Sequence, residues 1–332
     1  MNAAQLRESL KVLLQARRPV FVWGPPGIGK STIVNDVVTK DLGWGLIDMR
    51  AIHYDPVDLR GVPYVDRERQ TTRWATPEFF PHSGRGVIFA DELNAATSAT
   101  QAAFYQLVFD FRLGEYVMPE GWMVAAAGNR ESDRAVTYRM PSALENRFVH
   151  LELEVDPVEW ALWAINNGLR QDIISFMKYR PETLFVFDPA HHEHAFPTPR
   201  TWHFLSGVMD RVDVGNTDIA YGLASGIVGP GAAAEYMGFA KIYRDLPKVE
   251  TILSKPGTAK IPKDPAILYA LAGLLARNVT KDLYAAAITY ADRLPPEIGV
   301  LFMQDSIVIH PDLARTQAFS AWANQHQDII FL

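Results

Sequence analysis

Short apolar segments recur along the first half of the chain, and glycine or polar residues follow each of them. Three are Val20–Trp23, Gly86–Ala90 and Trp122–Ala127, and a fourth comes directly after Arg147. Uninterrupted apolar runs of this length are typical of parallel strands that are buried on both faces. Since helical periodicity appears between such runs, the pattern predicts an α/β fold for this half of the chain.

The second half is predicted to be mainly helical. The segment Leu253–Asp264 is rich in Lys, Pro and Gly and is predicted to be a linker or a long exposed loop. The expected helices are Val158–Leu169, Gln171–Tyr179, Ala266–Arg277, Lys281–Arg293 and Leu313–Gln325. Their apolar stripes are most simply core, although an oligomer collar or a partner-docking surface would show the same pattern.

Asp58–Trp74 has a different, alternating pattern that predicts a β-hairpin. With a four-residue turn at Arg67–Gln70, Tyr64 pairs with Arg73. One apolar face then carries four side chains: Pro63, Val65, Thr72 and Trp74. Because an isolated two-stranded hairpin is marginal in water, we expect this face to pack on the body of the protein or on a neighbour. A second hairpin is predicted at Gly114–Trp122.

Composition narrows the class of protein. The chain has 332 residues, of which 48% are hydrophobic, as in a folded globular protein. Its net charge of −6 argues against attraction of the whole surface to nucleic acid or to an anionic membrane, although a local basic groove stays open. With no cysteine, disulfides, thiolate zinc sites and thiol catalysis are excluded. No signal-peptide core or membrane-spanning apolar run is found, so we expect a cytoplasmic protein.

The most specific motif follows the first apolar run. Gly24–Ser31 reads G-x-x-x-x-G-K-S, between a predicted strand and a predicted helix. Glycines there let backbone N–H groups surround phosphate oxygens, Lys30 reaches the β- and γ-phosphates, and Ser31 binds Mg²⁺ through its hydroxyl. A plain glycine turn before a helix is the alternative, and the strand–loop–helix order disfavours it.

Two more strand ends carry candidate groups. The run Gly86–Ala90 ends in Asp91 and Glu92, where the first carboxylate can join the magnesium shell and the second can accept a proton from an attacking water. Asn129 ends the next run and could hydrogen-bond the water and the γ-phosphate, although Asn beside Gly is more often a plain turn.

Two arginines lie further along. Arg147 ends a short predicted helix, where an arginine is ordinarily a helix-dipole partner or a surface charge. Arg200 begins a helix just after Pro199, where the dipole disfavours a cation, and this cost suggests a use. Arg130 and Arg139 lie in the same region as Arg147 and are alternatives to it.

Taken in order, these residues resemble the AAA+ ATPases. The Walker A segment runs from Gly24 to Ser31 and the Walker B segment from Val87 to Glu92. Asn129, Arg147 and Arg200 stand where that family has sensor 1, the arginine finger and sensor 2. Asn94 and Gln101 narrow the resemblance to the MoxR branch. It implies that ATP is bound by Gly24, Pro25, Pro26, Gly27, Ile28, Gly29, Lys30, Ser31 and Thr32, and Mg²⁺ by Ser31 and Asp91. The catalytic residues that it implies are Glu92, Asn129, Arg147 and Arg200.

The resemblance also implies an architecture. A P-loop three-layer αβα core with a parallel five-stranded sheet would occupy residues 1–153, a helical lid 154–252, and a C-terminal helical extension 253–332. A shorter lid segment than is usual in MoxR proteins separates Arg147 from Arg200, so Arg200 can read its own subunit's nucleotide or a neighbour's.

Partners follow from the same resemblance. A ring, expected to be a hexamer, would hydrolyse ATP between subunits and remodel a protein partner, such as one with a von Willebrand A domain, and the hairpin at 58–74 would point toward the central pore. A DNA-directed AAA+ motor and a monomeric P-loop small-molecule kinase are the alternatives. The Asp91–Glu92 pair and the two late arginines count against the kinase.

Overall fold

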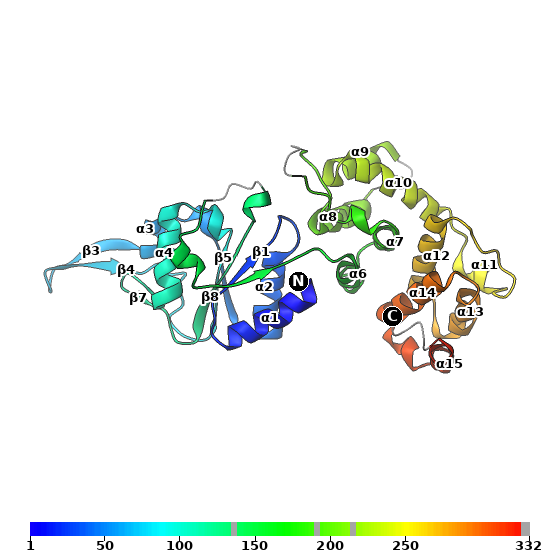
Figure 1. Ribbon diagram of the computed structural model, residues 1–332, viewed down its shortest axis with the longest axis horizontal. Coiled ribbons are helices and arrows are strands. Elements are labelled where there is room, and N and C mark those ends of the chain that lie inside the picture. The colour runs from blue at the N-terminus through cyan, green and yellow to red at the C-terminus, as the bar shows by residue number, and fades with distance from the viewer. Residues whose placement is uncertain (134–137, 189–192, 213–216, 327–332) are drawn as a thin grey trace. The chain divides into compact units, whose positions relative to one another are not determined.

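A computed structural model describes residues 1–133, 138–188, 193–212 and 217–326. The chain divides into two compact units, Met1–Asp156 and Pro157–Leu332, and each is described by itself (Figure 1). His191 and His192, which form part of a histidine-rich stretch, lie outside the described residues.

The first unit is built on a five-stranded parallel sheet, as predicted. Its strand order is β2-β5-β8-β1-β9, with all four neighbouring pairs parallel. The strands are β1 (Val20–Trp23), β2 (Gly45–Arg50), β5 (Gly86–Asp91), β8 (Trp122–Gly128) and β9 (Val149–Glu152). Every residue of β8 is buried, and so is all of β5 except its last residue, which is why these segments read as continuous apolar runs.

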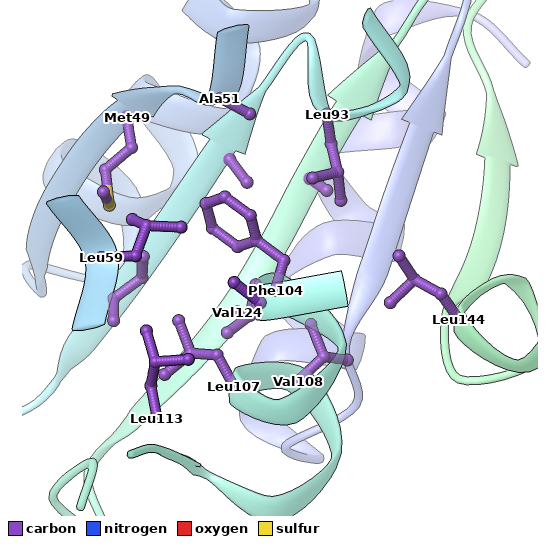
Figure 2. Packing of buried hydrophobic residues seen from close by; sticks show 14 of the residues in the cluster. Met49, Ala51, Leu59, Leu93, Phe104, Leu107, Val108, Leu113, Val124 and Leu144 are labelled. Carbon is purple, nitrogen blue, oxygen red and sulfur yellow. The ribbon is translucent and has the colours of Figure 1, made fainter. Parts of the chain in front are cut away.

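Helices cover both faces of this sheet (Figure 1). They are α1 (Ala3–Gln15), α2 (Lys30–Asp36), α3 (Pro56–Arg60), α4 (Ser98–Asp110) and α5 (Ser142–Glu145). On one face, Phe104 and Leu107 of α4 and Leu59 of α3 pack with Val124 of β8 (Figure 2). Since side chains of a strand alternate between faces, the neighbouring residues of the same strands meet α1 and α2 on the other side.

Two hairpins extend from the first unit. In β3 (Val62–Asp66) and β4 (Thr71–Ala75) the register confirms the prediction, with Tyr64 opposite Arg73. Gly61 closes the base with φ of +87°, and a β-carbon there would lie 1.8 Å from the Ala75 carbonyl oxygen. The hairpin therefore requires glycine at this position.

The expected burial of the hairpin's apolar face is not met within this chain. Val65 is 70% exposed, Pro63 and Thr72 are exposed as well, and only Trp74 is half-buried. Tyr64, on the other face, is 48% exposed. The hairpin thus projects from the body of its own domain, and most of its apolar face is exposed.

The second hairpin begins two residues before the predicted range of Gly114–Trp122 and ends five residues before its end. Its strands are β6 (Arg112–Leu113) and β7 (Tyr116–Val117), with Leu113 opposite Tyr116. Gly114 begins the turn with φ of +58° and therefore does not lie in a strand. The buried ring of Tyr116 stacks on Phe80, which fixes this hairpin on the domain.

The second unit is helical in the residues that the structure describes. Its α-helices are α6 (Pro157–Asn166), α7 (Gln171–Tyr179), α8 (Pro199–Met209), α9 (Thr217–Val228), α10 (Pro230–Arg244), α11 (Val249–Leu253), α12 (Pro265–Asn278), α13 (Lys281–Ala291), α14 (Pro296–Ile309) and α15 (Gln317–Gln325). Helices α9, α10, α11 and α14 were not predicted individually, and the helix expected at Leu313–Gln325 is a 3₁₀ turn followed by α15. Residues 254–264 join α11 to α12 without regular helix or strand, which agrees with the long-loop prediction, and they lie inside the second compact unit.

Candidate nucleotide site

The phosphate-binding loop lies between β1 and α2. Gly27 and Gly29 have φ of +79° and +98°, a backbone conformation that side-chain-bearing residues rarely adopt. A β-carbon on Gly24 would lie 2.7 Å from the Ile28 side chain and 2.9 Å from the Leu153 carbonyl oxygen. The three glycines therefore let the chain fold tightly against its own backbone and end at the N-terminus of α2, where N–H groups and the helix dipole favour an anion.

Lys30 is folded into this loop. It is 8% exposed, and its Nζ donates hydrogen bonds to the carbonyl oxygens of Gly24 (2.6 Å) and Pro25 (2.9 Å). It also donates to Asn129 Oδ1, 2.9 Å away at the end of β8. A single ammonium group thus joins the loop to the predicted sensor residue.

Ser31, in the first turn of α2, meets Asp91, the last residue of β5. Ser31 Oγ donates to Asp91 Oδ2 at 2.6 Å, and the backbone N–H of Glu92 donates to Asp91 Oδ1 at 3.0 Å. A hydroxyl beside a carboxylate is the oxygen donor set that Mg²⁺ takes from proteins, with phosphate and water completing its octahedron. The two residues therefore fit a magnesium ion.

Glu92 has a left-handed backbone, with φ of 55° and ψ of 35°. For a residue other than glycine this conformation costs about 1–3 kcal/mol and is concentrated at functional sites. It turns the chain from β5 into the 3₁₀ turn Leu93–Ala95. Nearby on β2, burial and then the negative charge of Asp91 raise the pKa of Asp48.

Asn94 joins the ends of β5 and β8. Its side-chain Nδ2 donates to the backbone carbonyl oxygen of Asn129 at 2.7 Å, and its backbone carbonyl oxygen accepts from the Tyr138 N–H at 2.7 Å. Asn94 is 3% exposed, and a β-carbon on Gly128 would lie 2.1 Å from its Oδ1. In the sequence, Asn94 was only one of the residues that carried the family resemblance. Its hydrogen bond to the Asn129 carbonyl shows that it positions the end of β8 beside Asn129.

A family comparison decides what this domain is. The sequence model of the ATPase family associated with various cellular activities (AAA) matches residues 20–151, from β1 into β9. These residues are an AAA ATPase domain.

No curated protein matches the chain. Among solved structures, NtrX from Brucella abortus is similar at 11% identity and a TM-score of 0.43, with 96% of this chain and 64% of NtrX covered. A RuvB variant from Thermotoga maritima is similar at 18% identity and a TM-score of 0.41, with 82% and 81% covered. The chain thus spans less than two thirds of the length of NtrX.

Within the AAA domain, Arg147 stands apart from the hydrogen-bonded group around Lys30. It follows α5, and its Nη1 donates a short hydrogen bond to the Ala143 carbonyl oxygen. Its guanidinium carbon lies 4.5 Å from the ring centroid of Tyr105 and 4.1 Å from that of Phe109, both on α4. Sequence reasoning missed these two rings because the contact joins segments far apart in the chain.

Of the alternatives to Arg147, Arg130 is engaged within its own subunit. Its Nη1 donates to Glu152 Oε1 at 2.6 Å, and its Nε lies 3.4 Å from Asp133 Oδ1. Burial alone would lower the pKa of Arg130, but these two carboxylates raise it. Arg147 makes no ion pair among the described residues, so the geometry favours it over Arg130 as the arginine that meets a neighbour.

Arg200 belongs to the second unit. It is exposed in the first turn of α8, where Thr198 caps the helix by accepting from the Thr201 N–H at 3.1 Å. Among the described residues no group of three or more metal-ligating side chains occurs, and no helix there is long and apolar enough to cross a bilayer.

Proposed function

We propose that this chain is a cytoplasmic MoxR-like AAA+ motor that assembles as a ring, expected to be a hexamer, and uses ATP hydrolysis to remodel a protein partner. The observation that carries the proposal is the pairing of two features in one domain. A hydrogen-bonded nucleotide site joins three strand ends, and a hairpin with an open apolar face is inserted between two strands of the same sheet. Residues 154–252 would form the lid and residues 253–332 an extension.

At the nucleotide, each side chain takes a role that its position permits. Lys30 would turn from the loop carbonyls to the β- and γ-phosphates, and Ser31 and Asp91 would hold the metal. When bound, Mg²⁺ neutralises charge on the phosphate oxygens. Glu92 would accept a proton from the attacking water, and Asn129, held by Asn94, would orient that water.

The site would be completed by a neighbouring subunit. Arg147 lies on the domain surface rather than among the groups around Lys30, as expected for a residue that acts in trans. An arginine finger supplied in trans contributes a factor of about 10³ to 10⁵ in kcat. The isolated monomer would accordingly be almost inactive. Arg200 would read the nucleotide of its own subunit or of a neighbour.

The β3–β4 hairpin would be the output of the motor. Val62 and Val65 are 65% and 70% exposed, and apolar side chains that project from a domain are typical of a protein-binding element rather than a nucleic-acid-binding one. Arg73 Nε lies 3.6 Å from Glu115 Oε2 in the turn of the second hairpin, so an ion pair joins the two hairpins. The partner would be a protein, such as one with a von Willebrand A domain, that the hairpin face contacts.

A mixing experiment tests the ring. Lys30→Ala and Arg147→Ala proteins are each expected to be inactive, and to recover ATPase activity when combined, because one supplies an intact finger and the other an intact phosphate site. No recovery in confirmed mixed rings would remove the finger role. Activity of a dilute monomer would instead indicate the kinase class.

A second experiment tests the partner. The Glu92→Gln protein is expected to bind ATP without turning it over, so a partner bound in that state should co-purify with it. Replacing Arg67–Gln70 with Asn-Gly should abolish remodelling of that partner while changing ATP turnover far less. If turnover were instead stimulated by DNA in a salt-sensitive manner, the DNA-directed motor would replace this proposal.

A further inference from the structure

Two aromatic rings of α4 form a seat for Arg147. Tyr105 and Phe109 are four residues apart and therefore on one helix face, with ring centroids 6.2 Å apart and planes 28° from parallel. The guanidinium carbon of Arg147 lies over both, at 4.5 and 4.1 Å from the centroids. Both distances are well within the range of about 6 Å for an attractive cation–π contact.

The seat lies at the surface and does not contribute to the core. The Phe109 side chain is 53% exposed, whereas Leu107 and Val108, the two residues before it in α4, are buried in the core. The buried Nε of Arg147 has no hydrogen-bond partner among the described residues. The two rings and the Ala143 carbonyl are thus what orients this guanidinium.

We propose that Tyr105 and Phe109 are positioning residues for Arg147, which hold it ready for the nucleotide of the neighbouring subunit. This inference rests on the proposed function, in which Arg147 acts in trans. Ordering an arginine side chain costs about 2 kcal/mol of rotamer entropy. The rings that contact the guanidinium of Arg147 restrict its rotamers before the neighbouring subunit binds, so less of this entropy is lost on assembly. The ring faces leave the outer N–H groups available to phosphate oxygens.

Helix α4 is suited to this task because its start is fixed at the Walker B end of the sheet. Thr97 caps it by accepting from the Thr100 N–H at 3.2 Å, and Gln101 Nε2 donates to the Ala96 carbonyl oxygen at 3.0 Å. Gln101 is fully buried. A group held by a rigid, anchored helix keeps its geometry better than one held by a loop.

Phe109→Leu is the primary test, because this exposed ring can be lost without opening the core. It is expected to lower kcat about two- to fivefold, which corresponds to the loss of one exposed cation–π contact, while the KM for ATP stays unchanged because the subunit's own pocket is intact. Tyr105→Leu should do the same. Phe109→Tyr and Tyr105→Phe keep a ring face and should restore kcat, and Tyr221→Leu, which removes a 40%-exposed ring in the helical unit, should have no effect.

Mixing separates positioning from general damage. The Phe109→Leu protein has an intact phosphate site, so adding Lys30→Ala subunits, whose Arg147 seat is intact, should restore turnover. A loss of kcat that the added subunits do not restore, or an unchanged kcat in both leucine variants, would overturn the positioning role. If Lys30→Ala and Arg147→Ala subunits also failed to restore each other's activity, the assignment of Arg147 as the arginine finger would be wrong. If those two variants did restore activity, only the positioning role of Tyr105 and Phe109 would be wrong.

Discussion

Gly128→Ala is expected to disrupt the link between the ends of β5 and β8. The added β-carbon would lie 2.1 Å from Asn94 Oδ1, 2.8 Å from Asn94 Cγ and 2.8 Å from Phe21 Cζ. Phe21 is fully buried and Asn94 is held by its bond to the Asn129 carbonyl, so neither can move freely. The methyl group must therefore displace the Asn94 side chain or distort β8.

The expected cost follows from the size of this overlap. Inserting one carbon into a packed interior typically costs about 1–3 kcal/mol, and the lost hydrogen bond adds about 0.5–1.5 kcal/mol. For a unit of this size, each kcal/mol lowers Tm by about 2–4 °C. Turnover should fall as well, because Asn129 also holds Lys30.

Thermal unfolding and steady-state ATPase assays measure both effects, and a double-mutant cycle assigns them to Asn94. In an Asn94→Ala background the 2.1 Å overlap is gone, so the further loss from Gly128→Ala should shrink by about 1 kcal/mol or more. Gly207→Ala is the matched control, since its β-carbon would meet no atom within 4 Å and alanine favours a helix. Losses that add to within about 0.3–0.5 kcal/mol would refute the reasoning.

Three further predictions concern other sites. Lys178→Met leaves Asp305, which is 3% exposed, without its ion-pair partner and should lower the free energy of unfolding by about 3–5 kcal/mol in chemical denaturation. The double variant Lys178→Met/Asp305→Leu should recover most of this loss. Because burial already raises the pKa of Asp305, the single variant should be more stable at pH 5.5 than at pH 7.5, and an opposite slope would contradict this. Gly61→Ala should open the base of the hairpin and speed proteolysis between 62 and 75, with little change in Tm. The free energy of unfolding of Glu92→Gly should exceed that of Glu92→Ala by about 0.5–1 kcal/mol. Both lack the carboxylate, and the relief of about 1–2 kcal/mol of left-handed strain outweighs the extra entropy that glycine loses on folding. A Glu92→Gly protein less stable than Glu92→Ala would contradict strain at this position.

Local patterns predicted the parts of the fold that local physics determines. Buried parallel strands read as apolar runs, and the phosphate loop needs glycines at fixed spacing, so both were visible in sequence. The register of the β3–β4 hairpin was predicted because alternation and a four-residue turn leave few ways to pair the strands.

What the sequence did not predict depends on contacts between distant segments. Helix α14 is apolar on most of its surface, and Phe302 and Met303 are almost fully buried, so it lacks the polar face that marks a helix in sequence. The exposure of Val65 could not be seen either, because alternation shows that two faces differ and not whether anything covers one of them. The seat of Arg147 joins residues about 40 positions apart and leaves no periodic signal.

The strained backbone at Glu92 ties these observations together. An extended residue there would continue β5 beyond Asp91 and carry Asn94 away from β8. The left-handed turn instead starts the 3₁₀ segment that brings Asn94 Nδ2 to the Asn129 carbonyl, while the Glu92 N–H holds the Asp91 carboxylate against Ser31. One unfavourable residue thus sets the geometry of the carboxylate at the metal position and of the amide beside Lys30. The left-handed backbone costs about 1–3 kcal/mol of folding free energy. In return, the ends of β5 and β8 are held in place before ATP binds and need no reorganisation during turnover.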